Sequence, residues 1–199
     1  VLQAARMVSD TDAGGKGMRI AVLKFGGTSL STAEARQSAI RHIRRVLEQQ
    51  LKAVVVVSAM GRKGDPYATD TLLEWIAQNG NGLPPRERDL LLACGEIISA
   101  STLCSMLRRL GVDATVLTGG QAGIITNGHF GDARILAIDP QPLLNLLKSG
   151  RVPVVAGFQG QTREGEVTTL GRGGSDTSAV ALGVALNAVQ SCRPVALVV

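Results

Sequence analysis

The chain has 199 residues, which is long enough for one domain with a sizeable core and short for two. Hydrophobic residues make up 45% of it and charged residues 19%, as in ordinary globular domains, but aromatic residues make up only 3%. The formal net charge is +5. Because binding of nucleic acid by stacking needs aromatic side chains, we expect no nucleic-acid partner and assign the positive charge to an anionic small molecule.

The cysteines and the apolar runs bear on where the protein resides. The chain has three cysteines, Cys94, Cys104 and Cys192, and no C-x-x-C motif. We therefore expect reduced, buried thiols in a cytoplasmic protein. No apolar run reaches the roughly 18 residues of a membrane span, and the N-terminus has no apolar signal core. We therefore expect no membrane partner.

Predicted strands and helices alternate along the first half of the chain, after a flexible tail over residues 1–17. Ser31 followed by Glu34 forms a capping-box pattern that predicts a helix start. The predicted strands are the apolar runs Arg19–Phe25, Ala53–Ala59 and Val112–Leu117. The predicted helices run from Ser31 to about Gln50, over Thr69–Gln78, and from Pro84-Pro85 to about Leu110.

The second half continues the alternation after a glycine-rich loop, which allows a short hairpin. The predicted elements are the loop Thr118–Asp132, the strands Ala133–Ile138 and Val152–Gly157, a helix between Pro140 and Gly150, a hairpin over Thr162–Thr169, and a helix from Ser175-Asp176 to about Ala188. This alternation predicts an α/β fold, a three-layer αβα sandwich with a mostly parallel sheet.

The first glycine turn follows the first predicted strand. Lys24 precedes Gly26-Gly27, and two glycines would let phosphate oxygens approach the backbone N–H groups at a helix start. Lys24 would bring a positive charge to a transferred phosphoryl group. The alternative is a tight strand-to-helix turn. The pattern is not a Walker A motif, because the lysine comes before the glycines.

The second glycine turn is Gly171-Arg172-Gly173-Gly174. Ser175 or Asp176 could bind there or could cap the helix that follows. An arginine on an exposed glycine turn has no packing task, whereas its guanidinium matches a carboxylate or phosphate in bidentate geometry. The turn is therefore predicted to bind an anion.

Two further positions point to the same region. Ser58 follows the four-valine strand. Ligands of open α/β sheets bind beyond the carboxyl ends of strands, so Ser58 is expected to share a site with Lys24. The alternative is that its hydroxyl caps the next segment. Glu96 lies in an apolar helix stretch, where a carboxylate is costly unless it is paired. It could bind a substrate ammonium group or lie at an exposed helix position. His42 and His129 have no ligand companions, so no metal site is predicted.

Five motifs together resemble one known family. They are Lys24–Ser29 (KFGGTS), Val54–Gly61 (VVVVSAMG), Leu91–Ser99 (LLACGEIIS), Ala156–Gly160 (AGFQG) and Thr169–Ala179 (TLGRGGSDTSA). In this order, from about Arg19 to Ala188, they resemble the aspartate kinases of the amino-acid kinase superfamily. Ser58–Asp70 (SAMGRKGDPYATD) further resembles the aspartokinases of Bacillus-like bacteria, including the diaminopimelate-sensitive type.

The resemblance implies a fold and a reaction. It implies an αβα sandwich with an eight-stranded sheet and transfer of the γ-phosphoryl group of ATP, with Mg²⁺, to the β-carboxylate of L-aspartate. This is the entry step to lysine, threonine and methionine. The nucleophile is a carboxylate, which is ionised at neutral pH, so positioning and charge neutralisation are sufficient and no general base is required.

The resemblance also implies roles for individual residues. Arg172 would clamp the α-carboxylate of aspartate, Glu96 would hold its ammonium group, and Asp176 would orient Lys24 or the metal-bound phosphate. The implied catalytic residues are Lys24, Arg172 and Asp176; the phosphate-binding residues Lys24, Gly26, Gly27, Thr28, Gly173 and Gly174; the substrate-binding residues Ser58, Thr69, Asp70, Glu96, Arg172 and Ser175.

The resemblance ends at about Ala188. Relatives continue with a T-D-V-D-G-like segment that seats the adenine and ribose, and then with regulatory ACT domains. Residues 18–199 are therefore expected to form an amino-acid kinase domain that is incomplete at its C-terminus, without an ACT domain. Three alternatives stay open: a kinase of glutamate, acetylglutamate or a nucleoside monophosphate, a truncated non-catalytic remnant, and an aspartate-binding module. A homo-oligomer is also open.

Because the expected adenine segment is absent from the pattern, we predict weak or undetectable ATP turnover by this chain alone. A coupled ADP-release assay with L-aspartate measures it. Robust turnover at ordinary ATP concentrations would contradict the expectation.

Overall fold

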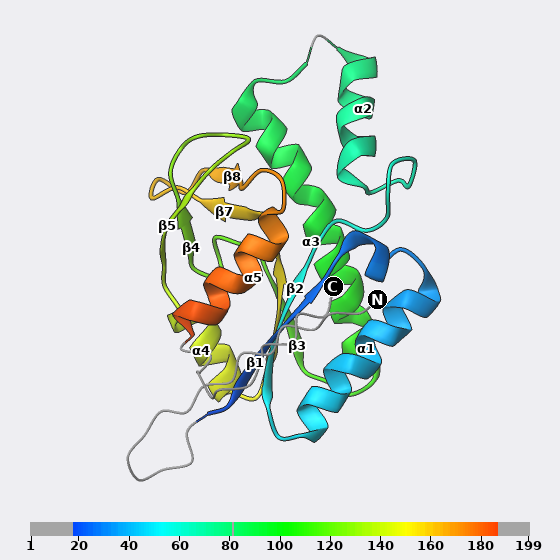
Figure 1. Ribbon diagram of the computed structural model, residues 1–199, viewed down its shortest axis with the longest axis vertical. Coiled ribbons are helices and arrows are strands. Elements are labelled where there is room, and N and C mark those ends of the chain that lie inside the picture. The colour runs from blue at the N-terminus through cyan, green and yellow to red at the C-terminus, as the bar shows by residue number, and fades with distance from the viewer. Residues whose placement is uncertain (1–17, 81, 187–199) are drawn as a thin grey trace.

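The computed structural model describes residues 18–80 and 82–186, so the predicted tail 1–17, Cys192 and the segment beyond Leu186 lie outside the described residues (Figure 1). The strands are β1 (Ile20–Phe25), β2 (Lys52–Val57), β3 (Ala114–Leu117), β4 (Ile124–Thr126), β5 (Ile135–Ile138), β6 (Val152–Ala156), β7 (Gln159–Gln161) and β8 (Val167–Thr169). The helices are α1 (Ala33–Glu48), α2 (Thr69–Asn79), α3 (Pro85–Arg109), α4 (Gln141–Lys148) and α5 (Gly174–Ala185), with a 3-10 turn at Gly27–Ser29.

A parallel sheet forms the centre of the molecule. Its strands lie in the order β1-β2-β6-β3, and every neighbouring pair is parallel. The four valines of β2 are 0% exposed. Continuous apolar strands of this kind are typical of parallel sheets whose two faces are both covered.

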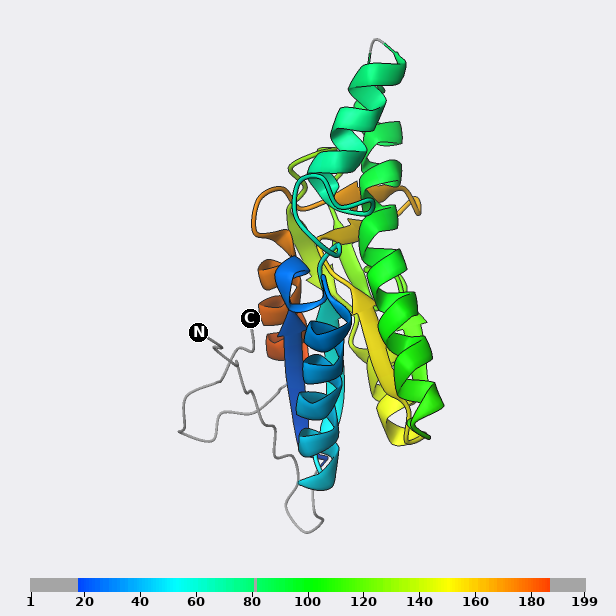
Figure 2. The ribbon, with the colours of Figure 1, turned by 90° about the vertical axis from the view of Figure 1, so that its right-hand side faces the viewer.

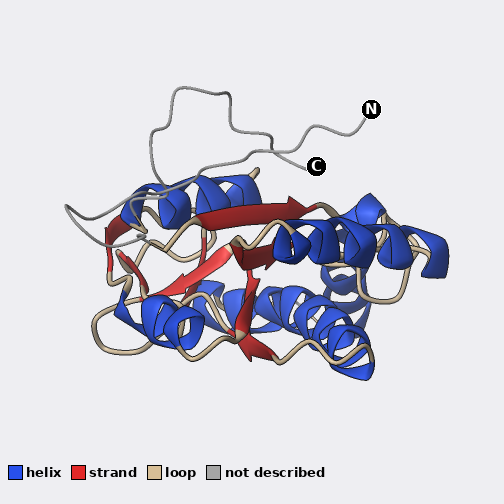
Figure 3. Cartoon of the chain, turned by 90° about the horizontal axis from the view of Figure 1, so that it is seen from below, coloured by secondary structure: helices blue, strands red, loops and turns tan. Residues whose placement is uncertain are grey.

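Helices cover both faces of this sheet, as Figures 2 and 3 show. Successive side chains of a strand point to opposite faces. Val55 and Val57 accordingly pack with α1 and α3, including Leu103. Val54 and Val56 pack with α4 and α5 on the other side. The predicted three-layer αβα arrangement is confirmed.

A second, mixed sheet lies beside the first. Its order is β5-β4-β7-β8, with β4 antiparallel to β5, β7 antiparallel to β8, and β4 parallel to β7. The eight described strands therefore form two four-stranded sheets, where the resemblance implied one sheet of eight. Phe158, between β6 and β7, has a left-handed backbone with φ of 66°, and this bend turns the chain out of the parallel sheet.

The predicted cap of α1 is wrong, and the capping alternative for Ser175 and Asp176 does not hold. Thr32, not Ser31, caps α1: its hydroxyl accepts a hydrogen bond from the Ala35 amide at 3.1 Å, while the Ser31 hydroxyl donates to the Thr28 carbonyl. A capping residue needs an extended backbone just before the helix, and Thr32 has it. The cap of α5 is Gly173, with φ of 75°, and no side chain caps that helix.

Two expectations about exposure also need correction. Cys94 is exposed, although a buried thiol was expected, and its thiol donates to the Leu90 carbonyl. By length and composition alone, α3 is apolar enough to cross a membrane, although no such run was expected. This is weak support for a membrane span, because half of its apolar window is buried inside the protein and core helices pass the same test.

Packing of α3 on the sheet is expected to contribute strongly to stability. Leu103 is 0% exposed, so Leu103→Ala should leave a cavity and lower the free energy of unfolding by roughly 2–5 kcal/mol. Leu110, just beyond the same helix, is 53% exposed, and Leu110→Ala should change it by only about 0.5 kcal/mol. Urea denaturation measures both. Equal losses would show that α3 is not anchored through this core.

Candidate active site

The parallel register brings several predicted site residues to one edge of the sheet. Phe25 pairs with Val57, and Val57 pairs with Ala156, so β1, β2 and β6 end side by side. A cavity of about 530 Å³ lies beyond these carboxyl ends. It is the position at which open α/β sheets bind ligands.

Most of the predicted site residues line this cavity. They are Lys24, Gly27, Ser58, Thr69, Asp70, Glu96, Arg172, Gly173, Gly174, Ser175 and Asp176. Gly26 and Thr28 are not among the lining residues. The two glycine turns, which lie far apart in the sequence, thus face one cavity, while the roles assigned to the individual residues stay predictions.

Lys24 is held at the end of β1 by a carboxylate from α5. Only 5% of Lys24 is exposed, and its Nζ lies 3.0 Å from Oδ1 of Asp176. Lys24 and Val22 point to the same face of the sheet, which α5 covers, so the strand period brings the two charges together. The pair gives the cavity an ammonium group in a fixed position beside the first turn of α5.

Gly27 is required by packing. A Cβ there would lie 2.6 Å from the Ala59 carbonyl oxygen and 2.8 Å from that of Gly61, and the Gly61 amide donates to the Gly27 carbonyl at 3.0 Å. The tight-turn interpretation therefore accounts for Gly27. At Gly26 a Cβ would meet only the Lys24 Nζ, at an ordinary 3.5 Å.

The second turn needs glycine for conformational reasons. Gly171 and Gly173 have φ of 72° and 75°, in the left-handed region that side chains disfavour. A Cβ on Gly174 would lie 2.8 Å from the Phe158 ring. Arg172 is exposed on this turn, and among the described residues its side chain has no ion pair or hydrogen-bond partner. The guanidinium is thus available to a ligand.

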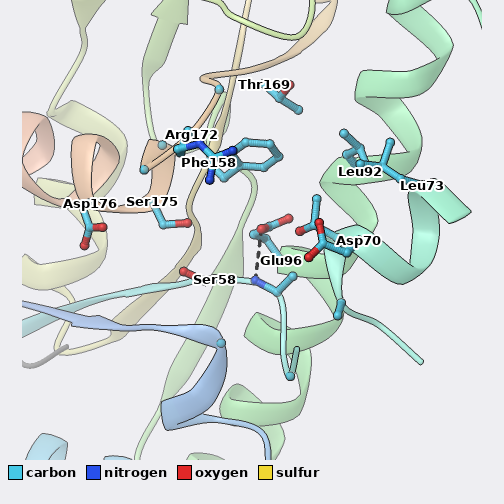
Figure 4. A pocket seen from close by; sticks show the side chains of 18 of the residues that line it. Ser58, Asp70, Leu73, Leu92, Glu96, Phe158, Thr169, Arg172, Ser175 and Asp176 are labelled. Carbon is cyan, nitrogen blue, oxygen red and sulfur yellow. Dashed lines mark hydrogen bonds between the residues drawn. The ribbon is translucent and has the colours of Figure 1, made fainter. Parts of the chain in front are cut away.

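Glu96 is buried and only partly satisfied. It is 2% exposed; Oε1 accepts a hydrogen bond from the Ala59 amide at 3.0 Å, whereas Oε2 has no hydrogen-bond partner among the described residues (Figure 4). Burial raises the pKa of this carboxyl to about 8, although the Ala59 amide opposes the shift. The interpretation of Glu96 as an exposed helix position is wrong.

The cavity carries an excess of positive charge. Its lining includes three cationic side chains that sequence reasoning did not select, Arg62, Lys63 and Arg88. Together with Lys24 and Arg172, they exceed the three lining carboxylates, Asp70, Glu96 and Asp176. This excess favours an anionic ligand.

Helical spacing could have revealed one of these side chains. Arg88, Leu92 and Glu96 recur every four residues, on one face of α3, and all three line the cavity. Phe158 was missed as an individual residue, although it lies within the AGFQG motif. Within residues 18–80 and 82–186, no group of three or more His, Cys, Asp or Glu side chains could hold a metal ion.

Comparison with known proteins assigns the family. The chain matches the amino acid kinase family over residues 19–192 and belongs to it. Aspartokinase 1 of Bacillus subtilis (strain 168) is 52% identical over 171 residues, which make up 86% of this chain and 42% of that protein. The resemblance to aspartokinases, including those of Bacillus, is confirmed, and this chain spans less than half of that relative.

Solved structures agree on the fold. The aspartate kinase from Synechocystis superposes with a TM-score of 0.67 at 44% identity, covering 84% of this chain and 26% of that one. E. coli aspartokinase III in complex with aspartate and ADP superposes with a TM-score of 0.63 at 26% identity, covering 84% and 47%. The amino-acid kinase fold is thus confirmed for the part of the chain that they cover.

Burial of Glu96 predicts a pH dependence of stability. Its pKa in the folded chain, about 8, lies above the ordinary 4.5, so its stabilising contribution is complete below about pH 4.5 and is lost as the pH rises to about 8. In Glu96→Gln the side chain does not ionise, so this decrease in stability with rising pH is absent. Between about pH 5 and pH 8.5, wild type should lose on the order of a few kcal/mol relative to the variant in urea denaturation.

Glu164→Gln is the matched control. Glu164 is exposed, and hydrogen bonding to Thr162 lowers the pKa of its carboxyl, so that variant should not reproduce the effect. Parallel stability profiles of wild type and Glu96→Gln would show that Glu96 ionises freely in the fold.

Proposed function

We propose that this chain forms the part of an aspartate kinase that binds L-aspartate and the phosphates of ATP. The observation that carries the proposal is the combination, in one cavity, of a buried carboxyl with an unpartnered oxygen and an unpaired guanidinium, Glu96 and Arg172. An α-amino acid offers an ammonium group to the first and a carboxylate to the second. The names of the relatives support this, since aspartokinase III of E. coli was solved with aspartate and ADP.

In the proposed complex, Glu96 is ionised by the ligand it binds. In the free chain its raised pKa keeps the carboxyl largely protonated near neutral pH. A substrate ammonium beside Oε2 favours the carboxylate form, which then makes a charge-assisted hydrogen bond. Ser58, Thr69 and Ser175 also line the cavity and supply neutral hydrogen-bonding groups.

The phosphates are assigned to the wall formed by the end of β1 and the start of α5. Lys24, held by Asp176, supplies a fixed positive charge, and Gly173 and Gly174 place the start of α5 against the cavity without side chains in the way. The N-terminal end of a helix favours anions. Mg²⁺ would enter with the nucleotide, and Asp176 is the carboxylate on this wall that would face it; the bound ion would neutralise phosphate charge.

The reaction follows from this arrangement. A β-carboxylate oxygen of aspartate forms a bond to the γ-phosphorus of ATP as the bond to the β–γ bridging oxygen breaks, giving 4-phospho-L-aspartate and ADP. The nucleophile is already ionised, so no side chain has to remove a proton. The cationic groups lower the barrier by compensating charge on the transferred group.

The proposal also covers the cellular setting. We place the whole protein in the cytoplasm, at the entry step to lysine, threonine and methionine, with the diaminopimelate-sensitive subtype as a prediction. Two readings compete with it. A kinase of glutamate or acetylglutamate would use the same fold with another acceptor, and a non-catalytic aspartate-binding module would bind the amino acid without turnover.

Calorimetric titration separates these readings. L-aspartate should bind more tightly than L-glutamate and N-acetyl-L-glutamate. Glu96→Gln should weaken L-aspartate binding by roughly 10- to 100-fold, since it removes a hydrogen bond to a charged group. Succinate, which lacks the ammonium group, should bind the variant and the wild type equally.

Glu48→Gln is the matched control, because Glu48 is exposed at the end of α1, and it should leave all four affinities unchanged. Tighter binding of L-glutamate or N-acetyl-L-glutamate would contradict the assigned substrate. Equal loss of succinate and L-aspartate binding would contradict the role of Glu96.

A further inference from the structure

Asp89, on the second turn of α3, is a buried carboxylate that the proposed reaction does not use. It is 0% exposed, and within residues 18–80 and 82–186 no lysine or arginine forms an ion pair with it. Burying a carboxylate is costly unless hydrogen bonds satisfy it. The hydrogen bonds that satisfy Asp89 therefore indicate its role in the structure.

Three donors from two distant segments satisfy this carboxylate. Oδ2 accepts hydrogen bonds from the amide of Thr169 at 2.7 Å and from the amide of Gly131 at 2.9 Å. Oδ1 accepts from the Thr169 hydroxyl at 2.9 Å. Thr169 ends β8, and Gly131 lies in the loop between β4 and β5, so one side chain of α3 joins both.

The same two segments carry the Arg172 turn. Thr169 and Gly131 both line the cavity, and the Thr169 carbonyl accepts from the Ala133 amide at 2.8 Å, which ties the segments to each other. Gly171 packs so closely on this loop that a Cβ would lie 2.7 Å from Oδ1 of Asp132. The backbone around Arg172 is therefore fixed by contacts that converge on Asp89.

This backbone determines the point from which the Arg172 side chain extends into the cavity. The Arg172 side chain has no hydrogen bond or ion pair with the described residues, so nothing else in them orients it. We infer that Asp89 is a positioning residue: it holds the end of β8 and the Gly131 loop together, and thereby sets Arg172 at the cavity wall. The part of this inference that concerns L-aspartate rests on the proposed function.

The test is Asp89→Asn in the full chain. The amide keeps the volume of the carboxyl but presents an NH₂ group where one oxygen accepted hydrogen bonds. We expect hydrogen exchange of the amides of Gly131, Thr169 and Leu170 to rise by at least about tenfold, with the amides of β2 unchanged. L-aspartate should bind at least about tenfold more weakly.

Two further variants complete the design. Asp113→Asn makes the same chemical change at an exposed carboxylate near the other end of α3 and should alter neither exchange nor affinity. Thr169→Val removes only the hydroxyl donor and keeps the amide, so it should give the same local pattern at smaller amplitude. If Asp89→Asn does not fold, the exchange pattern of Thr169→Val decides the matter.

The location of the rise in hydrogen exchange decides the role of Asp89. A rise in exchange confined to these two segments supports the inference. Exchange equal to wild type there, or a rise spread evenly over α3 and β2, overturns it, because Asp89 would then be either dispensable or a general anchor of the fold. If the wild-type chain binds no L-aspartate, the proposed function fails, and exchange alone decides the role of Asp89.

Discussion

The shared register of three parallel strands is the constraint on which the site depends. Because β1, β2 and β6 end side by side, Lys24, Ser58 and the bend at Phe158 meet at one edge without any long loop to bring them there. The valines that fix this register have no exposed surface. A slip by one residue would turn Lys24 away from Asp176 and into the layer of α1 and α3.

Two buried carboxyl groups on α3 differ in how completely the protein satisfies their hydrogen bonds. All the contacts of Asp89 are made within the protein, by three donors. Glu96, two turns further along, is equally buried but has an oxygen that the protein leaves without a partner. Burial of a polar group is costly in both cases, and the unmet contact of Glu96 is the one that the proposed ligand would satisfy.

Features encoded locally could be predicted from the sequence, and features that depend on tertiary contacts could not. The apolar runs located β1, β2, β3, β5 and β6, and the glycine turns located part of the cavity lining. The chain leaves the parallel sheet at Phe158, whose backbone is left-handed. Phenylalanine rarely adopts this conformation, so the sequence could not predict it. Asp89 stands in the charged stretch RERD and has the sequence signature of a surface residue, because its donors come from segments 42 and 80 residues away. The cap of α1 was misplaced by one position because Ser31 and Thr32 are both good capping residues.

The exposed setting of Arg172 has a consequence for how this site can evolve. The turn around it is held by its glycines and by the segments beneath it, while the arginine side chain itself touches no polar partner in the described residues. Exchange of that one side chain therefore costs the fold little. Ligand preference can drift at this position independently of stability, so the same scaffold can be adapted to other acceptors by point substitution while the flanking glycines stay fixed.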